Sequence, residues 1–267
     1  MHPAQPGVLQ YIKKGSKMLA RHRIQLLGNL SLALATIAAT SVSAADKIKV
    51  TLYEEALCPA CIGYFDAGTD LQPVNSGFWV MYENLKDIVD AEVVMWGNAI
   101  GDPSQGSDAV TCQHGEVECR GNLLFGCAKN LYPDVDAQLS LIHCFDSVLI
   151  ETFPGGLPSG TVNMTMMDDT IKACASETDV NMDYDKLDAC ASGDDGMTYL
   201  QAEKDKTPGH TGVPFTVIGD GDAECPPPDD LTAAVCGAYT GLNKPEACNA
   251  AALSSKEGSW TSKVSLF

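Results

Sequence analysis

The clearest chemistry in this chain lies in the cysteine pair Cys58 and Cys61, which are separated by Pro59 and Ala60. Two thiols at this spacing can close a small disulfide ring, and opening or closing that ring exchanges two electrons with another disulfide. The nucleophile in this exchange is the anionic sulfur, which is stabilised where a helix begins and backbone N–H groups are free. CxxC spacings arise readily by chance in a chain with 11 cysteines. The surrounding residues therefore decide the interpretation.

The residues on both sides of the pair predict the first βαβ unit of a thioredoxin-type fold. Residues 48–53 alternate apolar and polar side chains, which is typical of a half-buried strand. Apolar side chains at Ile62, Phe65 and Leu71 predict a helix after the pair, residues 79–89 predict a second helix, and residues 91–96 predict a second strand. In that setting we expect Cys58 to be the exposed nucleophile and Cys61 the resolving thiol.

Two other interpretations of the pair remain open. A structural disulfide in so small a ring stabilises a fold by about 2 kcal/mol, against about 4.7 kcal/mol for a 100-residue loop. Half of a zinc site would need further ligands, and the spacing of Cys112, His114 and Cys119 resembles no common zinc finger. We predict no metal site. Glu54 and Glu55 precede the pair, and a carboxylate close to Cys58 would oppose formation of the thiolate.

The rest of the chain predicts an insertion and a closing unit. Residues 97–207 are expected to form a mainly helical insertion stapled by disulfides, with a helix over 135–149 and a Gly- and Pro-rich loop over 154–160. Residues 212–219 predict a strand with Pro214 at its first residue, and residues 231–239 predict a helix. We expect a cis bond between Val213 and Pro214, whose backbone groups would bind the substrate chain. An ordinary trans proline at a sheet edge is the alternative.

The N-terminal residues have the order of a secretory signal peptide. A basic start is followed by an apolar run over 24–39 and by small residues up to about position 44. An uncleaved membrane anchor is the alternative, although the run is shorter than the roughly 20 residues of a spanning helix. Residues 45–250 would then form one domain, and residues 251–267 a polar tail.

The composition excludes some partners and points to an oxidising compartment. The formal net charge is −18, and loss of the leader would change it to −23 because all five Lys and Arg residues there would be removed. We therefore predict no binding to nucleic acid, and none to membranes once the leader is cleaved. Many cysteines behind a signal peptide are typical of secreted proteins with disulfides.

Residues 112–127 carry the pattern CQHGxxECxxNxxxxC, which resembles the signature of the gamma-interferon-inducible lysosomal thiol reductase family. The CxxC pair upstream, Val213-Pro214 downstream, and residues 235–239 with Pro245 and Cys248 follow the same order, so the resemblance covers about residues 47–248. It implies a thioredoxin-like α/β fold with a helical insertion, and reduction of disulfides in proteins that are being unfolded or degraded, often at acidic pH. It also implies that Cys58 and Cys61 are the active pair.

The other cysteines are expected to be structural. Eight are candidates for disulfides of undetermined pairing: Cys112, Cys119, Cys127, Cys144, Cys174, Cys190, Cys236 and Cys248. Cys225 is then the odd thiol or an intermolecular link. Within the signature, we expect Gln113, His114 and Asn122 to satisfy backbone groups in a tight turn, with a catalytic role of His114 as the alternative. Asn163 begins an N-glycosylation sequon on an expected surface loop.

Together these features predict a thiol–disulfide oxidoreductase that reduces protein disulfides in a lysosome- or vacuole-like or extracellular compartment of the secretory pathway. Its expected partners are disulfide-containing proteins and a small thiol reductant, and no bound cofactor is expected. A disulfide isomerase or oxidase of the same fold is one alternative, separable by its reduction potential. A non-catalytic secreted binding module with an inert CxxC is another.

Overall fold

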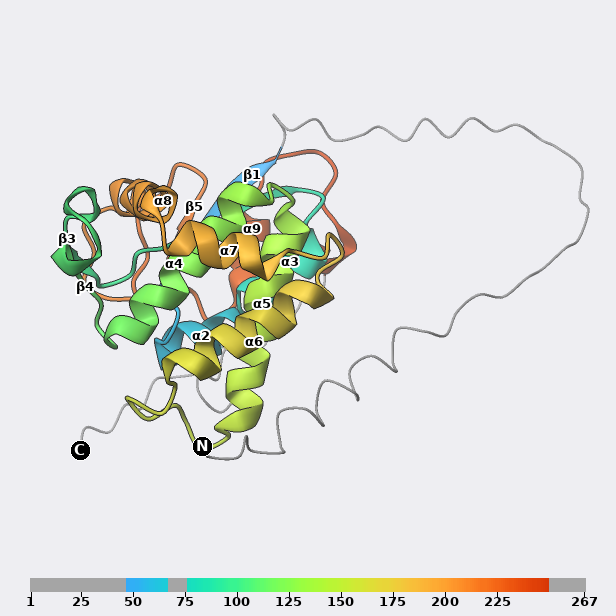
Figure 1. Cartoon of the computed structure of the whole chain (residues 1–267). Coiled ribbons are helices and arrows are strands. Elements are labelled where there is room, and N and C mark those ends of the chain that lie inside the picture. Colours follow the sequence, from blue (N-terminus) through green and yellow to red (C-terminus); the bar gives the residue numbers. More distant parts are fainter. Residues whose placement is uncertain (1–46, 67–75, 250–267) are drawn as a thin grey trace, which may run out of the picture. The chain divides into compact units, whose positions relative to one another are not determined.

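The computed structural model describes residues 47–66 and 76–249 (Figure 1). The predicted signal peptide, Leu71 of the predicted first helix, and the predicted C-terminal tail lie outside the described residues.

A three-stranded sheet lies at the centre of the described part, with the strand order β2-β1-β5. Its strands are β1 (Ile48–Glu54), β2 (Val89–Met95) and β5 (Phe215–Ile218). β1 and β2 are parallel, and β5 is antiparallel to β1. Glu224 then pairs with Thr216 in an antiparallel bridge on the outer side of β5. A parallel βαβ unit followed by two antiparallel segments and a helix is the arrangement of a thioredoxin-like fold, as the sequence predicts.

Both faces of β1 are covered, because the strand is buried from Val50 to Glu54. Val50 and Leu52 point into the main core. On the other face the ring of Tyr53 stacks on the ring of Phe215 at a centroid distance of 4.4 Å. The prediction of a half-buried strand is therefore wrong from Val50 onward, because Thr51 and Tyr53 are buried as well.

Three helices accompany the sheet: α2 (Pro59–Phe65), α3 (Phe78–Leu85) and α9 (Leu231–Ala238). The predicted second helix is wrong at its C-terminal end. It stops at Leu85, whose carbonyl accepts a hydrogen bond from the N–H of Ile88 in a turn. The carbonyl of Ile88 then accepts from Ile48, and Val89 begins β2, because sheet pairing outweighs the helical spacing of these two β-branched residues.

The segment between β2 and β5 is mainly helical. Its helices are α4 (Glu116–Leu131), α5 (Val135–Thr152), α6 (Met164–Glu177), α7 (Tyr184–Ala191) and α8 (Asp194–Lys206). A small hairpin of β3 (Ile100–Gly101) and β4 (Val110–Thr111) precedes them, and the sequence analysis does not anticipate it. In Figure 1, α6 and α7 lie across α5 and α4.

Four disulfides fasten this fold. Cys127–Cys190 joins α4 to α7, and Cys144–Cys174 joins α5 to α6. Cys112–Cys119 closes the loop at the start of α4, and Cys236–Cys248 joins α9 to the segment that follows it.

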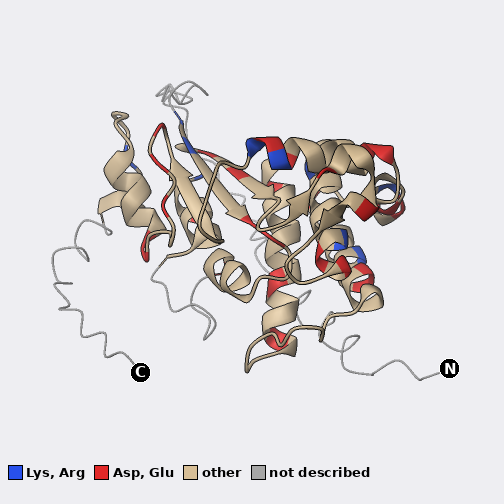
Figure 2. Cartoon of the chain, turned by 90° about the vertical axis from the view of Figure 1, so that its left-hand side faces the viewer, with Lys and Arg blue, Asp and Glu red and all other residues tan. Residues whose placement is uncertain are grey.

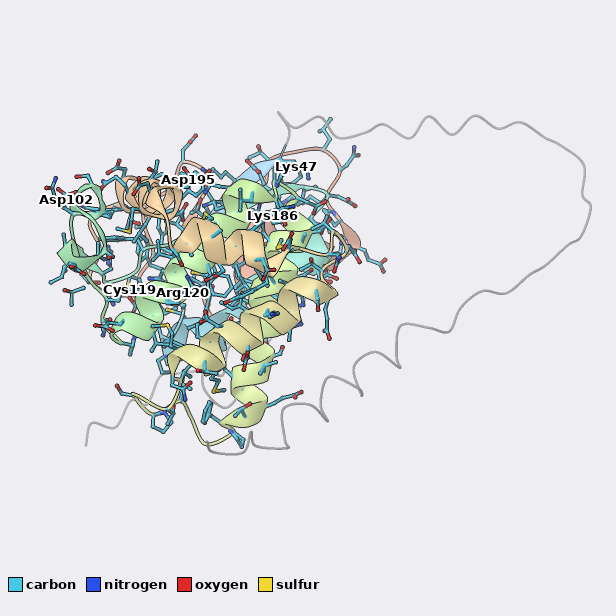
Figure 3. The ribbon with its side chains drawn as sticks, viewed as in Figure 1. Lys47, Asp102, Cys119, Arg120, Lys186 and Asp195 are labelled. Carbon is cyan, nitrogen blue, oxygen red and sulfur yellow. A yellow bond between two sulfur atoms is a disulfide. The ribbon has the colours of Figure 1, made fainter. Side chains whose placement is uncertain are left out.

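An ion-pair network adds to the covalent links around α4. Figure 3 labels Cys119 and Arg120 in the first turns of this helix. The Arg120 guanidinium pairs with Asp168 of α6, at an Nε–Oδ1 distance of 3.0 Å, and with Asp188 of α7. α4 is therefore the helix to which the rest of the insertion is tied.

Acidic residues dominate the charged positions of the chain, with 35 Asp and Glu against 17 Lys and Arg. Figure 2 shows them on helices and loops alike, with few basic residues between them. Among the described helices, none has the length and apolar character that crossing a bilayer requires.

Candidate functional site

Cys58 forms the N-cap of α2, directly after the turn that leaves β1. Its N–H donates to the carbonyl of Glu55, and its sulfur accepts a hydrogen bond from the N–H of Cys61 at 3.3 Å. Pro59 at the first helical position has no N–H to satisfy, which favours a helix start here. The N-cap geometry thus places a backbone N–H on the Cys58 sulfur, where it stabilises negative charge.

The expectation of an exposed Cys58 is wrong, because only 6% of the residue is accessible. The segment before β5 lies over it, with the carbonyl oxygen of Val213 at 3.9 Å from the Cys58 sulfur. Pro59, Ala60 and Val213 around it are half-buried. A partner sulfur must therefore approach between α2 and the Val213 segment.

Cys61 lies deeper, at 1% exposure. Burial raises the pKa of its thiol well above the usual range, and the hydrogen bond with Cys58 and the nearby charges of Cys58 and Glu54 raise it further. Neither thiol is in a disulfide in the structure. Cys61 is therefore a protonated thiol that needs a proton acceptor before it can attack.

Two buried carboxyl groups lie close to the thiols. Burial raises the pKa of Glu54 well above its ordinary value, and the charge of Cys58 raises it further. Oε1 of Glu54 has no hydrogen-bond partner. Asp146 of α5 is also buried, and its pKa is raised by burial first and then by the charges of Glu54 and Asp66. Sequence reasoning missed Asp146.

Val213 and Pro214 are joined by a cis peptide bond. Pro214 lies just before β5, which begins at Phe215, and is not the first residue of the strand as predicted. Phe215 is held from both sides, by Tyr53 and by the ring of His210 at a centroid distance of 5.0 Å. The Val213 backbone is thereby positioned beside Cys58.

The signature residues of α4 and the loop before it contact the turn that precedes Cys58. The side-chain oxygen of Asn122 accepts from the buried N–H of Ala56 at 2.9 Å. A Cβ on Gly121 would lie 2.6 Å from the Cβ of Ala56, so glycine permits this close approach. Asn122 does satisfy a backbone group, as expected, but in the turn before Cys58 and not in its own loop.

Asn98, which the sequence analysis does not single out, connects three of these segments. Its N–H donates to Oε2 of Glu55 at 2.7 Å, and its side-chain amide donates to Gln113 at 2.5 Å. Its side-chain oxygen lies 3.2 Å from Nε2 of His210. No local pattern marks an asparagine for such a position.

His114 lies between two buried glutamates. Its Nδ1 is 2.5 Å from Oε2 of Glu118 and 3.5 Å from Oε1 of Glu55. Burial and the charge of Glu118 raise the pKa of Glu55, hydrogen bonds from Asn98 and the charge of His114 lower it, and the result is about 7. Within the described part of the chain, these three residues are the group whose ligand atoms lie close enough together to hold a metal ion.

The remaining predicted site residues lie away from this centre. The eight structural disulfide candidates pair as described above, and the Cys112–Cys119 bond makes these two residues unable to act as zinc ligands with His114. Cys225 is exposed, with its sulfur 3.4 Å from the carbonyl oxygen of Gly212. Asn163 is exposed, but it forms the N-cap of α6, where its side-chain oxygen accepts from Met166.

Comparisons with known proteins identify relatives of this chain. A family model described as gamma interferon inducible lysosomal thiol reductase (GILT) matches residues 49–154. The chain is 30% identical over 232 residues to a gamma-interferon-responsive lysosomal thiol protein of Arabidopsis thaliana, covering 82% of this chain and 84% of that protein. It is 31% identical over 215 residues to a gamma-interferon-inducible lysosomal thiol reductase of Carassius auratus, covering 76% and 73%.

Among solved structures, DsbA from Mycobacterium tuberculosis in its reduced form superposes with a TM-score of 0.45 and 17% identity, covering 78% of this chain and 88% of that one. A superposition at this level adds nothing to the topology described above. The sequence relationships are stronger, because they reach 30% and 31% identity over most of both chains. This chain belongs to the gamma interferon inducible lysosomal thiol reductase family, a family of thiol–disulfide oxidoreductases.

Proposed function

We propose that this chain reduces disulfides in protein substrates, with Cys58 as the attacking thiol and Cys61 as the resolving thiol. The observation that carries the proposal is the position of the Cys58 sulfur. It lies 3.3 Å from the N–H nitrogen of Cys61 and 3.9 Å from the carbonyl oxygen of Val213. One side of the sulfur thus meets the resolving residue, and the other meets backbone groups that can hold an extended substrate chain.

The reaction proceeds in two exchanges. The Cys58 thiolate attacks one sulfur of the substrate disulfide, a mixed disulfide forms, and the other substrate sulfur leaves as a thiolate that takes up a proton. Cys61 then loses its proton and attacks the Cys58 sulfur, which releases the second substrate thiol and leaves a Cys58–Cys61 disulfide. Two electrons pass to the substrate, and a small thiol reductant must return them for the next turnover.

The buried acids favour the direction of reduction. A pair becomes a strong oxidant when its reduced form, with a stable thiolate, is stabilised. Here burial, together with the charge of Glu54, raises the pKa of the Cys61 thiol, so its thiolate is less stabilised and we expect the pair to give up electrons more readily. We therefore place the chain with reductases, in preference to oxidases or isomerases. The acidic surface and the leader-like N-terminus support a lysosome-like or extracellular compartment.

The direct test measures reduction of a disulfide-linked protein such as insulin from pH 4 to 8 with excess small thiol. Cys58→Ser is expected to abolish turnover, and Cys61→Ser to accumulate a mixed disulfide with substrate that is visible in non-reducing gels. Cys225→Ser is the matched control and should keep its activity, because Cys225 is exposed and serine can keep the contact with the carbonyl of Gly212. Unchanged turnover by a folded Cys58→Ser variant would refute the proposal.

A redox titration separates the direction of the reaction from the identity of the pair. Equilibration with thiol–disulfide buffers should give a potential well below the value of about −120 mV that is typical of a strong oxidant. A potential near that value would assign the chain to disulfide formation, with the same two cysteines.

A further inference from the structure

We propose that Glu55, His114 and Glu118 form a binding site for a divalent transition-metal ion, with zinc as the ion that best suits the ligands. The site is built from the turn before Cys58 and from the loop and first turn of α4, and it is separate from the reaction at the thiols. The ligand atoms would be Oε1 of Glu55, Nδ1 of His114 and Oε2 of Glu118, which all lie within 4.8 Å of one another.

The two carboxylates are already oriented for this role. Oε2 of Glu55 accepts from the N–H of Asn98 at 2.7 Å, and Oε1 of Glu118 accepts from the N–H of His114 at 2.9 Å. Each glutamate therefore has one oxygen held by the backbone and directs the other oxygen toward the His114 ring. Backbone groups that orient ligands in this way are a regular part of metal sites.

Oε1 of Glu55 is the independent sign of a missing partner. Glu55 is 1% exposed, and this oxygen has no hydrogen-bond partner. A buried carboxylate oxygen without a partner is costly, and native structures rarely leave one so. The oxygen lies 3.5 Å from Nδ1 of His114, so an ion between them would satisfy it.

A divalent ion would also balance the charge of the cluster. Glu118 is fully buried, and among the described residues the only side chain that forms an ion pair with Glu55 or Glu118 is His114. When both glutamates are ionised, a protonated His114 balances only one of them, whereas a divalent ion balances both and leaves the imidazole neutral, as metal binding requires.

The geometry and donor types favour zinc. Two ligands of one tetrahedral zinc ion lie about 3.3 Å apart when each bond is about 2.0–2.2 Å. The Nδ1 atom of His114 lies 2.5 Å from Oε2 of Glu118 and 3.5 Å from Oε1 of Glu55, two distances that bracket this value, so small side-chain shifts would admit the ion. An imidazole nitrogen disfavours calcium and magnesium. The His114 side chain is 22% exposed, which leaves a path for the ion and a fourth position for water.

The test measures zinc binding by isothermal titration at pH 7 to the full chain carrying Cys58→Ser, Cys61→Ser and Cys225→Ser, because free thiols bind zinc themselves. We expect one zinc ion per chain. Zinc at about 100 times its dissociation constant should raise the Tm by about 5–10 °C. The Cys225→Ser chain with Cys58 and Cys61 joined in a disulfide should bind zinc equally and serves as the second preparation. This readout does not depend on reductase activity, so it stands whether or not the proposed reaction is correct.

Single substitutions then locate the ion. Glu55→Gln and Glu118→Gln keep an oxygen for the backbone N–H groups of Asn98 and His114 but remove the negative charge. Each of these two variants, and His114→Gln, should weaken zinc binding by about 100-fold or more. His143→Gln is the matched control, because His143 pairs with a single carboxylate, Asp66, and should leave binding unchanged. The proposal is overturned if neither thiol-free preparation binds zinc, or if folded Glu55→Gln and His114→Gln variants bind it as well as the parent.

Discussion

The disulfide at the start of α4 and the disulfide that joins α4 to α7 should rank in opposite order for their effects on stability and on activity. Cys112–Cys119 closes a loop with a sequence separation of 7, and Cys127–Cys190 closes one with a separation of 63. By the chain-entropy relation the short loop stabilises the fold by about 2.4 kcal/mol. The long loop alone would give about 4.3 kcal/mol. The Cys144–Cys174 bond lies inside it and roughly halves its path, which lowers the figure to about 3.8 kcal/mol.

The assay is urea unfolding of paired alanine variants without reductant, so that the other disulfides stay closed. Cys127→Ala/Cys190→Ala should lose about 1.4 kcal/mol more than Cys112→Ala/Cys119→Ala. Burial works in the same direction, because Cys127 is fully buried whereas Cys119 is half-buried, and truncation of a buried pair leaves a larger cavity. Equal midpoints, or a greater loss from the short loop, would refute the reasoning.

Activity should follow the reverse order. The short loop carries Gln113 and His114, which contact Asn98 and Glu55 beside the turn before Cys58. Opening it should lower insulin reduction at 25 °C more than opening the long loop does, although it destabilises the fold less. Full turnover by folded Cys112→Ala/Cys119→Ala would show that this loop does not order the turn.

Three further changes test other parts of the site and the sheet. Glu54→Gln should slow release of the mixed disulfide, measured by quenched-flow alkylation, because a buried proton acceptor near Cys61 is lost. Burial raises the pKa of Glu54, so the unfolded chain loses this proton more readily than the folded one and stability falls as pH rises above about 4.5. The variant should therefore also be more stable than wild type at pH 8. Asn122→Ala leaves the buried N–H of Ala56 without its acceptor, so unfolding free energy should fall by about 1–3 kcal/mol and amide exchange at Ala56 should accelerate. Burial raises the pKa of Glu92, but hydrogen bonds from Lys129, Lys206 and Lys49 outweigh burial and lower the pKa to about 2. The stability that ionised Glu92 contributes is present above about pH 4.5 and is lost as pH falls toward 2. Thermal melts of Glu92→Gln should therefore differ most from those of wild type at neutral pH and converge in acid.

The sequence predicts the elements that carry the thiols, because their signals are local. Alternation over residues 48–53 marks β1, and proline after Cys58 marks the start of α2. The end of α3 cannot be found in the same way. Ile88 and Val89 continue the helical spacing, and only pairing with β1 across the sheet assigns them to a turn and a strand.

The residues around the thiols differ in whether the sequence contains a signal for them. Asp146 carries a detectable signal, because Ile142, Phe145 and Leu149 place it on the apolar stripe of α5, where a charged residue requires an explanation. The contacts of Asn98 carry none. They depend on its backbone N–H and on a loop whose path is set by tertiary packing, so no spacing in the sequence encodes them.

The thiol centre has four buried carboxyl groups in or near it, which the composition alone does not reveal. Glu54 and Asp146 lie near the sulfurs, and Glu55 and Glu118 lie behind the turn, so four acids surround a reaction that needs an anionic sulfur. At neutral pH any of them that is ionised opposes the Cys58 thiolate through a medium that screens poorly. As pH falls, protonation of Glu54, Glu55 and Asp146 weakens this opposition, because burial raises the pKa of each of them. Protonation of these three acids therefore changes the electrostatic surroundings of the Cys58 sulfur as pH changes.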